Sequence, residues 1–329
     1  MKTYLVTGGA GFIGSYFIKY MLVKYEEIKI INFDKLTYAG NLDNLEEVNK
    51  DERYLFIQGD ICDKELVNEL FKEYNIDYVV NFAAESHVDR SIEDPEIFVK
   101  TNVLGTTNVL NCAKEAWETK EGFKAGVKFL QVSTDEVYGS LGKNGYFYEN
   151  TPLDPRSPYS SSKAGADLIV KAYYDTYSMP INITRCSNNY GPYQFTEKLM
   201  PLLITNCIEY KELPIYGDGL NVRDWLYVED HCRAIDMVLQ SGRLGEVYNI
   251  GGHNEKTNIE ITKIIIKYLK ENYDISISED LIKYVEDRKG HDRRYAIASD
   301  KIEKELGWSP ETSFEEGIIK TIKWYIKQN

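Results

Sequence analysis

The sequence contains no apolar run that could span a membrane. Its longest apolar stretches are short segments such as Ile261–Ile266, which a lysine interrupts, whereas a membrane helix needs about 20 consecutive apolar residues. The N-terminal segment Met1–Val6 runs directly into a strand-like pattern and has no small-residue cleavage site, so we expect no signal peptide. These absences predict a cytoplasmic protein that has no membrane partner.

Metal-binding and disulfide patterns are also missing. The five cysteines are scattered and odd in number, and none belongs to a C-x-x-C pair. The four histidines are isolated and lack the H-E-x-x-H spacing of a zinc site. We therefore expect buried thiols in a reducing compartment, with no disulfide framework and no metal.

The chain has fewer basic than acidic side chains. The chain has 39 Lys and Arg against 52 Asp and Glu, a formal net charge of −13, which argues against nonspecific binding to nucleic acid. An anionic small molecule could bind only through a local cluster of basic side chains and backbone N–H groups. The composition, 43% hydrophobic and 28% charged, is that of a globular protein. A length of 329 residues predicts two lobes.

The first two-thirds of the chain alternates strand-like and helical patterns, which predicts a Rossmann-type, doubly wound parallel sheet in the α/β class. The predicted strands are Tyr4–Thr7, Ile28–Phe33, Tyr54–Gln58, Tyr78–Phe82, Lys128–Ser133 and Ile181–Cys186, and the main predicted helices are Phe12–Lys24, Glu96–Trp117 and Ser161–Tyr177. Right-handed crossovers would bring the carboxyl ends of all these strands to one ligand-binding edge.

After Asn188 the pattern changes to short apolar pieces, helices and turns, which predicts a smaller mixed α/β lobe over the mouth of the sheet. We expect residues 1–187, together with about 222–250, to form the domain that contains this sheet. Residues 188–221 and 251–329 would then form the substrate-binding lobe.

Glycines at positions 8, 11 and 14 follow the first predicted strand and open the first predicted helix. Glycine lets the backbone turn tightly and approach a pyrophosphate, which binds to the free N–H groups at a helix N-terminus. A merely tight strand–helix turn is the alternative, but the strand–turn–helix context favours a dinucleotide site.

Asp34 ends the second predicted strand, about 20 residues after the glycines, where a carboxylate usually binds the ribose hydroxyls of NAD. A carboxylate there repels the 2′-phosphate of NADP, so NAD is the expected cofactor. Asp60 and Ile61 follow the third strand and could frame the adenine, although an N-cap role for Asp60 is nearly as good an interpretation.

Tyr159 and Lys163 are four residues apart at the start of a predicted helix, so both side chains project from one face. An ammonium beside a phenol favours the phenolate, and we expect it to lower the pKa of Tyr159 toward the working pH. A chance surface pair is the alternative. The pair follows a strand that ends in Ser133 and Thr134, which favours a catalytic role.

Thr134, Asp135 and Glu136 lie where the fifth predicted strand ends, on the ligand edge. These acidic side chains could simply cap a turn. Beside Tyr159 and a nicotinamide they would instead supply an acid and a base, because neighbouring carboxyls in a partly dry cleft have pKa values that are pushed apart.

Basic and aromatic side chains of the second lobe are candidate ligands of a phosphate, sugar or base: Lys198, Arg223, Arg288 and Arg293, with Tyr216 and Tyr295. Taken singly, each is more often a surface or core residue. The polar turn Asn188–Pro192 is suited to contact both ligands.

The chain resembles the extended short-chain dehydrogenase/reductases over essentially its whole length, and is similar in particular to the dTDP-glucose 4,6-dehydratase family. Thr7–Gly14 and Tyr159–Lys163 match the whole superfamily, whereas Thr134–Glu136 and Ser86–Arg90 are more specific. The other matching segments are Asp34–Asn41, Ala83–Ser91, Ser133–Gly139, Cys186–Pro192, Arg223–Asp230, Tyr248–Glu255 and Asp287–Ile297.

The resemblance implies roles for the catalytic candidates. Tyr159, assisted by Thr134 and Lys163, would deprotonate the glucose 4-hydroxyl. Glu136 would remove the proton at sugar C5, and Asp135 would protonate the departing 6-hydroxyl.

It also implies two ligand shells. Positions matching the NAD shell are Gly8, Gly11, Phe12, Ile13, Gly14, Asp34, Lys35, Leu36, Thr37, Asp60, Ile61, Phe82, Ala83, Ala84, Glu85, Ser86, Thr101, Tyr159, Lys163 and Asn189. Positions matching the nucleotide-sugar shell are Ser86, His87, Thr134, Asn188, Lys198, Leu199, Pro214, Ile215, Tyr216, Arg223, Asn258, Arg288, His291 and Tyr295.

One departure from the family is Lys289, where relatives usually carry proline. It could loosen this loop or add a phosphate contact. The identity of the nucleotide base in the substrate is also left open. Thymine differs from uracil by one methyl group, which is worth only about 1–3 kcal/mol of discrimination.

The alternatives are another nucleotide-sugar 4,6-dehydratase, a UDP-sugar 4-epimerase or decarboxylase, and a catalytically silent NAD-binding regulator. The acidic pair argues against an epimerase, and the intact Tyr159/Lys163 pair argues against a silent protein.

We further expect a homodimer built on the helices Glu96–Trp117 and Ser161–Tyr177, as the resemblance implies. These helices carry apolar residues beyond what one sheet face can cover: Phe98, Val109, Leu110, Leu168, Ile169 and Ala172.

Overall fold

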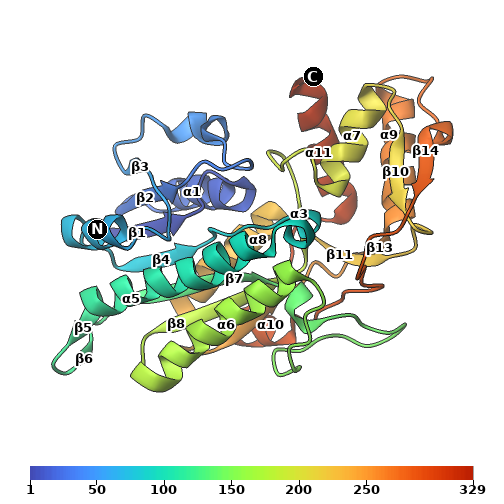
Figure 1. Ribbon diagram of the computed structural model, residues 1–329. Helices are drawn as coiled ribbons and strands as arrows, with labels where there is room; N and C mark the ends of the chain where they lie inside the picture. Colours follow the sequence, from blue (N-terminus) through green and yellow to red (C-terminus); the bar gives the residue numbers. More distant parts are fainter. Residues whose placement is uncertain (329) are drawn as a thin grey trace.

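The protein, described by a computed structural model over residues 1–328, has a central parallel sheet with a smaller lobe at one end (Figure 1). The strands of the sheet are β1 (Lys2–Thr7), β2 (Ile28–Asp34), β3 (Tyr54–Gln58), β4 (Tyr78–Asn81), β7 (Lys128–Thr134), β8 (Ile181–Cys186) and β12 (Val247–Ile250). They lie in the order β12-β8-β7-β4-β1-β2-β3, and all neighbours are parallel. The strand order reverses beside β1, where doubly wound sheets bind ligands. The predicted fold class is confirmed.

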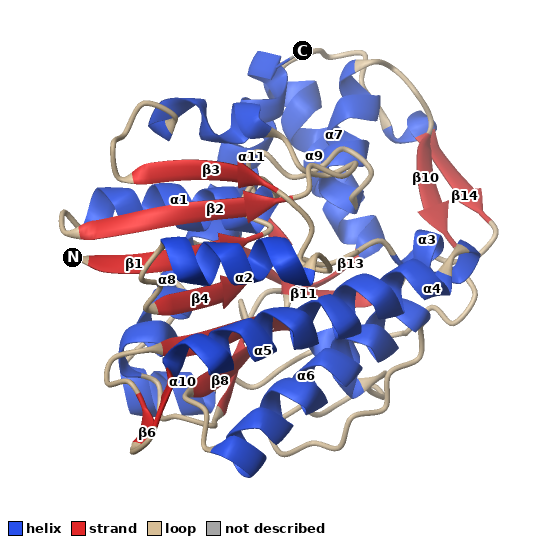
Figure 2. Cartoon of the chain, turned by 60° about the vertical axis from the view of Figure 1, so that its left-hand side comes forward, coloured by secondary structure: helices blue, strands red, loops and turns tan. Residues whose placement is uncertain are grey.

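Helices cover both faces of this sheet (Figure 2). One face carries α1 (Phe12–Lys24), α8 (Val228–Ser241) and α10 (Asp300–Leu306), and the other carries α2 (Lys64–Glu73), α5 (Thr106–Trp117) and α6 (Pro158–Tyr177). The inner strands β1, β7 and β8, together with β2, are buried on both faces, as their near-continuous apolar sequences require, and the edge strand β3 is half-buried.

The predicted single helix Glu96–Trp117 is three consecutive segments in the structure. They are α4 (Pro95–Phe98), the π-helical segment η2 (Val99–Gly105) and α5. The Asp94 side chain caps α4 by accepting from the backbone N–H of Ile97. Within η2 the side chain of Asn102 is buried. Hydropathy spacing did not indicate the wider π turn, because the apolar positions stay close to helical period.

Up to residue 328, the second lobe contains two small sheets and three α-helices. Its main elements are β9 (Asn188–Tyr190), α7 (Leu199–Ile208), β10 (Leu213–Tyr216), β11 (Val222–Tyr227), β13 (Glu255–Thr257), α9 (Asn258–Asn272), η4 (Glu279–Leu281), β14 (Ile282–Val285) and α11 (Phe314–Gln328). β13, β11 and β9 form one sheet, and β10 pairs with β14. A separate hydrophobic core joins α7, α9 and α11. Minor elements are η1 (Leu42–Val48), α3 (Val88–Glu93), the hairpin β5 (Glu118–Thr119) and β6 (Gly122–Phe123), and η3 (Asp135–Tyr138).

We propose to draw the domain boundary largely as the sequence suggests, with two changes. β11 lies within the expected range 222–250 but pairs with β9 and β13, so it belongs to the second lobe. β12 and α8 return to the main sheet from between second-lobe segments. In addition, Ile302 of α10 and Trp308 pack in the same core as α1 and α8. Residues 300–308 are therefore best assigned to the first domain.

Some of the apolar side chains that were expected at a dimer interface are instead buried within the chain. Phe98, Val109 and Leu110 are almost fully buried, because α4 and α5 pack closely beneath α6 and against the sheet. Leu168, also expected at the interface, is 61% exposed, and Leu104, which was not expected there, is 60% exposed. Of the other residues expected at the interface, Ala172 is exposed and Ile169 is half-buried.

Candidate active site

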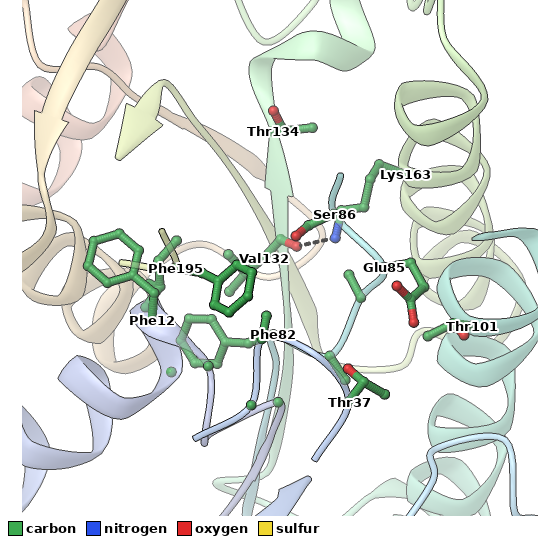
Figure 3. A pocket seen from close by; sticks show the side chains of 18 of the residues that line it. Phe12, Thr37, Phe82, Glu85, Ser86, Thr101, Val132, Thr134, Lys163 and Phe195 are labelled. Atoms are coloured by element: carbon green, nitrogen blue, oxygen red, sulfur yellow. Dashed lines mark hydrogen bonds between the residues drawn. The ribbon is translucent and has the colours of Figure 1, made fainter. Parts of the chain in front are cut away.

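A cavity of about 330 Å³ opens at the carboxyl ends of the central strands, beside β1. Segments that follow β1, β2, β3, β4, β7 and β8 all line it, and so does the start of α6. Every residue predicted for the NAD shell contributes to this lining except Leu36. In Figure 3 the rings of Phe12, Phe82 and Phe195 lie together on one side of the cavity, while Lys163 and Glu85 approach from the other.

The glycine turn brings backbone close to backbone at the floor of the cavity. Gly8 has a φ of +69°, and a Cβ there would lie 2.6 Å from the amide nitrogen of Ala83. A Cβ on Gly14 would lie 2.5 Å from the carbonyl oxygen of Gly8. α1 begins after Gly11 with no side-chain cap, so its first N–H groups are open to a phosphate. This cradle fits the pyrophosphate of a dinucleotide.

Asp34 ends β2 in the position that the sequence predicts for a ribose ligand. Its carboxylate accepts hydrogen bonds from the backbone N–H groups of Ala10 at 2.9 Å and Leu36 at 2.8 Å. Burial raises its pKa, and these two N–H groups oppose the rise. Leu36 is therefore outside the lining but orients Asp34 through its backbone, with a φ of +56°.

Asp60 also lies on the cavity and is not a helix cap. Its carboxylate pairs with Lys35 Nζ at 2.9 Å and accepts from the backbone N–H of Cys62. The N-cap of α2 is Asp63 instead, which accepts from the backbone N–H of Leu66. The N-cap interpretation of Asp60 is therefore wrong.

Tyr159 and Lys163 occupy the first two turns of α6, and both are buried at the cavity. Pro158 at the first helical position and a reciprocal Ser157–Ser160 capping box fix this helix start. Lys163 Nζ donates to the carbonyl oxygen of Val132 at 2.7 Å, the dashed line in Figure 3.

The expected lowering of the Tyr159 pKa by Lys163 does not occur. Burial raises the pKa of Tyr159 well above its usual value, and the charges of Glu136 and Asp135 raise it further, while a hydrogen bond between Tyr159 and Thr134 opposes them. Burial also lowers the pKa of Lys163. The prediction was wrong because it weighed the lysine alone and left out desolvation and the two carboxylates.

The acidic pair sits on η3, directly after β7. Thr134 is the N-cap of this turn: its Oγ1 accepts from the backbone N–H of Glu136 at 3.3 Å and donates to Asp135 Oδ1 at 3.2 Å. The carboxyls are thus not the caps of the turn, and both line the cavity.

The two carboxyls differ in their electrostatic surroundings. Burial raises the pKa of Asp135 well above its usual value, and the charges of Glu136 and Asp224 add to the rise. Burial also raises the pKa of Glu136, but the positive charges of Arg223, Lys198 and Arg288 oppose it. The more strongly raised Asp135 is suited to hold a proton, and Glu136 is suited to accept one.

Several buried polar atoms at the cavity have no hydrogen-bond partner within residues 1–328. They are Ser133 Oγ, Ser187 Oγ, Gln194 Oε1 and Asp135 Oδ2. Unpaired buried polar groups are costly, so their position on the lining fits a polar ligand that would satisfy them.

The residues predicted for the nucleotide-sugar shell divide into two groups. Ser86, Thr134, Asn188 and Lys198 line the cavity, and Lys198 Nζ donates to the carbonyl oxygen of Ser86 at 3.0 Å. A second cluster lies beyond the cavity lining and consists of Tyr216, Arg223, Arg288, His291 and Tyr295. Its guanidinium groups lie over tyrosine rings, Arg223 over Tyr295 at 4.3 Å and Arg288 over Tyr216 at 5.0 Å. The positive charges of Arg223 and Arg288 oppose the rise of the Glu136 pKa, so this basic cluster lies near the acidic pair.

The remaining members of that shell lie elsewhere. His87 caps α3, Leu199 begins α7, Pro214 and Ile215 lie on β10, and Asn258 begins α9. Ile215 is buried in the second core and therefore offers no side chain to the cavity. Asn258 Oδ1 is buried without a partner in the described chain.

Sequence reasoning missed two kinds of residue. Gln194 and Phe195 line the cavity just beyond the Asn188–Pro192 turn, so extending that motif by three residues would have found them. Asn102 gives no such signal. Its side chain accepts from the backbone N–H of Glu85 at 2.8 Å and donates to the Glu85 carbonyl at 3.0 Å and to Ser162 Oγ at 2.8 Å. It thereby joins a cavity loop to α6.

Among residues 1–328, no group of three or more His, Cys, Asp or Glu side chains is placed to hold a metal ion. No helix in this part of the chain is both long enough and apolar enough to cross a membrane.

Known proteins of similar sequence and structure include several dTDP-glucose 4,6-dehydratases. The family model for GDP-mannose 4,6 dehydratase matches residues 5–321. A dTDP-glucose 4,6-dehydratase of Xanthomonas campestris is 50% identical over 330 residues, covering 99% of this chain and 93% of that protein. A crystal structure of dTDP-glucose 4,6-dehydratase from Bacillus anthracis in complex with NAD has a TM-score of 0.89 and 53% identity, covering 99% and 97% of the two chains. The Streptomyces venezuelae enzyme, also solved with NAD, has a TM-score of 0.91 and 47% identity, covering 99% and 97%.

Proposed function

Because the chain belongs to the GDP-mannose 4,6 dehydratase family, and within it to the dTDP-glucose 4,6-dehydratases, we propose that it converts dTDP-glucose to dTDP-4-keto-6-deoxyglucose and water with NAD as cofactor. The observation that carries this proposal is the acidic pair beside Tyr159 on a dinucleotide cavity. NAD accepts hydride from sugar C4 and returns it to C6, so the reaction has no net redox change.

In the first step Tyr159, as its phenolate, takes the proton of the sugar 4-hydroxyl. Thr134 hydrogen-bonds to this phenol. Lys163, held by the Val132 carbonyl, places a buried amine one helical turn away. The raised pKa of Tyr159 means that the phenolate must be favoured by positive charge in the loaded site.

In the second step Glu136 removes the proton at C5 and Asp135 gives its proton to the C6 oxygen, which leaves as water. A C5 proton becomes acidic enough for a carboxylate only after C4 is a ketone, because the ketone stabilises the carbanion as an enolate. The stronger rise of the Asp135 pKa supports this division of roles.

The basic residues supply the anion binding that a net charge of −13 otherwise opposes. Lys198 lines the cavity, and Arg223 and Arg288 lie beside Glu136. We assign them to the substrate's sugar and diphosphate, with Tyr216 and Tyr295 covering its rings.

The acidic pair is also what separates this proposal from its rivals. A 4-epimerase needs only hydride transfer out and back, and a silent regulator needs neither carboxyls nor a Tyr–Lys pair. Buried carboxyls with raised pKa values are costly to keep without a use.

We also propose a homodimer in the cytoplasm. Exposed apolar side chains on the α4–η2 and α6 surface, including Val99, Leu104 and Leu168, support an interface there. The absence of a spanning helix within residues 1–328 is compatible with this location.

Incubating the purified protein with NAD and separate dTDP-, UDP- and GDP-glucose tests the proposal. We expect a product 18 mass units lighter than dTDP-glucose, as loss of water requires. Turnover of UDP-glucose to UDP-galactose, or no reaction with any sugar nucleotide, would refute it.

A further inference from the structure

A buried polar network lies next to the acidic pair, outside the residues that line the cavity. At its centre is the hydroxyl of Tyr138, the last residue of η3. This hydroxyl accepts a hydrogen bond from Arg185 Nη1 at 2.9 Å and donates one to Asn249 Oδ1 at 2.8 Å. Arg185 Nε donates to Asp167 Oδ2 at 2.9 Å. All four side chains are buried.

The network connects four elements of the catalytic domain. Tyr138 shares η3 with the acidic pair, and Asp167 lies on α6, four residues after Lys163 and so on the same helix face. Arg185 is on β8 and Asn249 on β12. The turn with the elimination residues is thereby joined to the helix with the oxidation residues.

η3 depends on these contacts because it is too short to hold itself. It has four residues, and Gly139 ends it with a φ of +87°. The Phe147 ring stacks on Tyr138 with centroids 5.1 Å apart, and Asn249 Nδ2 donates to the Phe147 carbonyl. The backbone N–H of Asp154 donates to the carbonyl of Val137.

We propose that the Tyr138 hydroxyl is a positioning group for the elimination step, holding η3 so that Glu136 and Asp135 meet sugar C5 and the C6 oxygen. The inference rests on the proposed function. Oxidation uses Tyr159 and Lys163 of α6, whereas elimination uses side chains of η3 alone. A misplacement of about 1 Å can cost about 10²-fold in rate, so loosening η3 slows elimination and spares oxidation.

Tyr138→Phe tests this directly, because it removes the hydroxyl and keeps the ring that stacks on Phe147. Tyr248→Phe is the matched control. Tyr248 is equally buried, and its hydroxyl also accepts one hydrogen bond, from the backbone N–H of Arg243, and donates one, to Glu305. Its partners lie away from η3.

In single-turnover experiments with NAD-loaded protein, we expect Tyr138→Phe to reduce the cofactor within about threefold of the wild-type rate. Formation of the 6-deoxy product should fall about tenfold or more. The 4-keto sugar should accumulate with little solvent deuterium at C5, and KM should stay unchanged. Tyr248→Phe should show no such split.

Asn249→Ala provides a second variant, since it removes the acceptor and leaves Tyr138 in place; the same split is expected. Equal slowing of both steps in the Tyr138 variant, or identical behaviour of the Tyr138 and Tyr248 variants, would overturn the inference and leave the proposed function standing. Wild-type protein that does not dehydrate dTDP-glucose would overturn both.

Discussion

At the scale of single residues, burial dominates the chemistry of this site. Desolvation raises the pKa values of Tyr159, Asp135 and Glu136. The charges of neighbouring groups also shift each of these pKa values. A site built this way holds protons until a ligand or a reaction step changes the local charge. It can therefore move them in a defined order.

Tyr159→Phe should stop the reaction before the cofactor is reduced. Hydride leaves C4 readily only as the hydroxyl proton is taken, and phenylalanine has no oxygen for that task. The rate should fall on the order of 10²–10⁴-fold, measured by the absorbance of reduced cofactor. Tyr173 lies on the same helix, and its hydroxyl donates a hydrogen bond to Asn111. The Tyr173→Phe variant should react normally. Near-normal turnover of the Tyr159 variant would remove it from the mechanism.

Glu136→Gln should still form the 4-ketone and reduce the cofactor, yet yield little 6-deoxy product, because the amide cannot remove the C5 proton. Wild-type turnover in deuterated water should place solvent deuterium at C5, while the hydrogen delivered to C6 should come from substrate C4. Mass spectrometry and proton NMR distinguish these positions. Product without solvent deuterium at C5, or normal dehydration by the variant, contradicts this role of Glu136.

Asp135→Asn should make the protein more stable at neutral pH while lowering its activity. The folded pKa of Asp135 is raised, so its stabilising contribution is complete below its unfolded pKa of about 3.9 and is lost as pH rises through the folded value. Asparagine does not titrate. The variant's advantage should therefore be absent near the unfolded pKa and grow with pH.

Thermal melts across this pH range measure the difference, and a gain of about 1 kcal/mol corresponds to about 2–4 °C. Asp175→Asn, on the exposed part of α6 and paired with Lys171, should change the midpoint little at any pH. An Asp135 variant less stable than wild type at neutral pH would contradict the prediction.

At the scale of elements, short irregular segments carry the site and regular ones hold them. The 3₁₀ turn η3 presents the acidic pair, and the π-helical segment η2 turns Asn102 inward to the loop after β4. π-helical turns are rare and often occur at functional sites. Here the wider turn places one amide where it can bond Glu85 and Ser162 together.

Asn102→Ala should weaken NAD binding and destabilise the fold by about 1–3 kcal/mol, because the buried N–H and carbonyl of Glu85 lose their partner. Asn182→Ala is the control: Asn182 is as deeply buried and bonds two carbonyls, those of Arg243 and Glu246, far from the cavity. The Asn182→Ala variant should lose a similar amount of stability without a change in its affinity for NAD. Calorimetric titration with NAD and urea unfolding separate the two effects, and equal NAD affinities in both variants would rule out this role of Asn102.

At the scale of the whole molecule, the cavity takes its lining from both lobes. The first lobe packs helices on the parallel sheet, and the core of the second lobe joins α7, α9 and α11. The segment 191–198 crosses between them, and its Phe195 ring meets Tyr38 edge-on at 5.6 Å. The cavity is therefore assembled from both lobes, and neither lobe contains it alone.

Leu168→Glu should break the proposed homodimer, because it places a charge in the centre of the exposed apolar surface of α6 and η2. Loss of a central apolar contact typically costs about 2 kcal/mol or more, about 30-fold in Kd. Sedimentation equilibrium at micromolar concentration measures it. Val23→Glu, at an even more exposed position on α1, should leave association unchanged. A wild-type protein that is monomeric at this concentration would contradict the proposed homodimer.

The sequence by itself determined the fold class, the cofactor and most of the cavity lining. Strand–helix alternation, the glycines at 8, 11 and 14, and Asp34 are local signals, since each follows from backbone geometry within a few residues. The family resemblance extended these signals to the roles proposed for Tyr159 and the acidic pair.

Only the tertiary structure decided the direction of the Tyr159 pKa, the burial of Ile215 in the second core and the burial of Phe98, Val109 and Leu110. It also revealed Asn102 and the Tyr138 network. Desolvation, charge from distant segments and burial between elements depend on which parts of the chain meet in space, and no local spacing encodes those meetings.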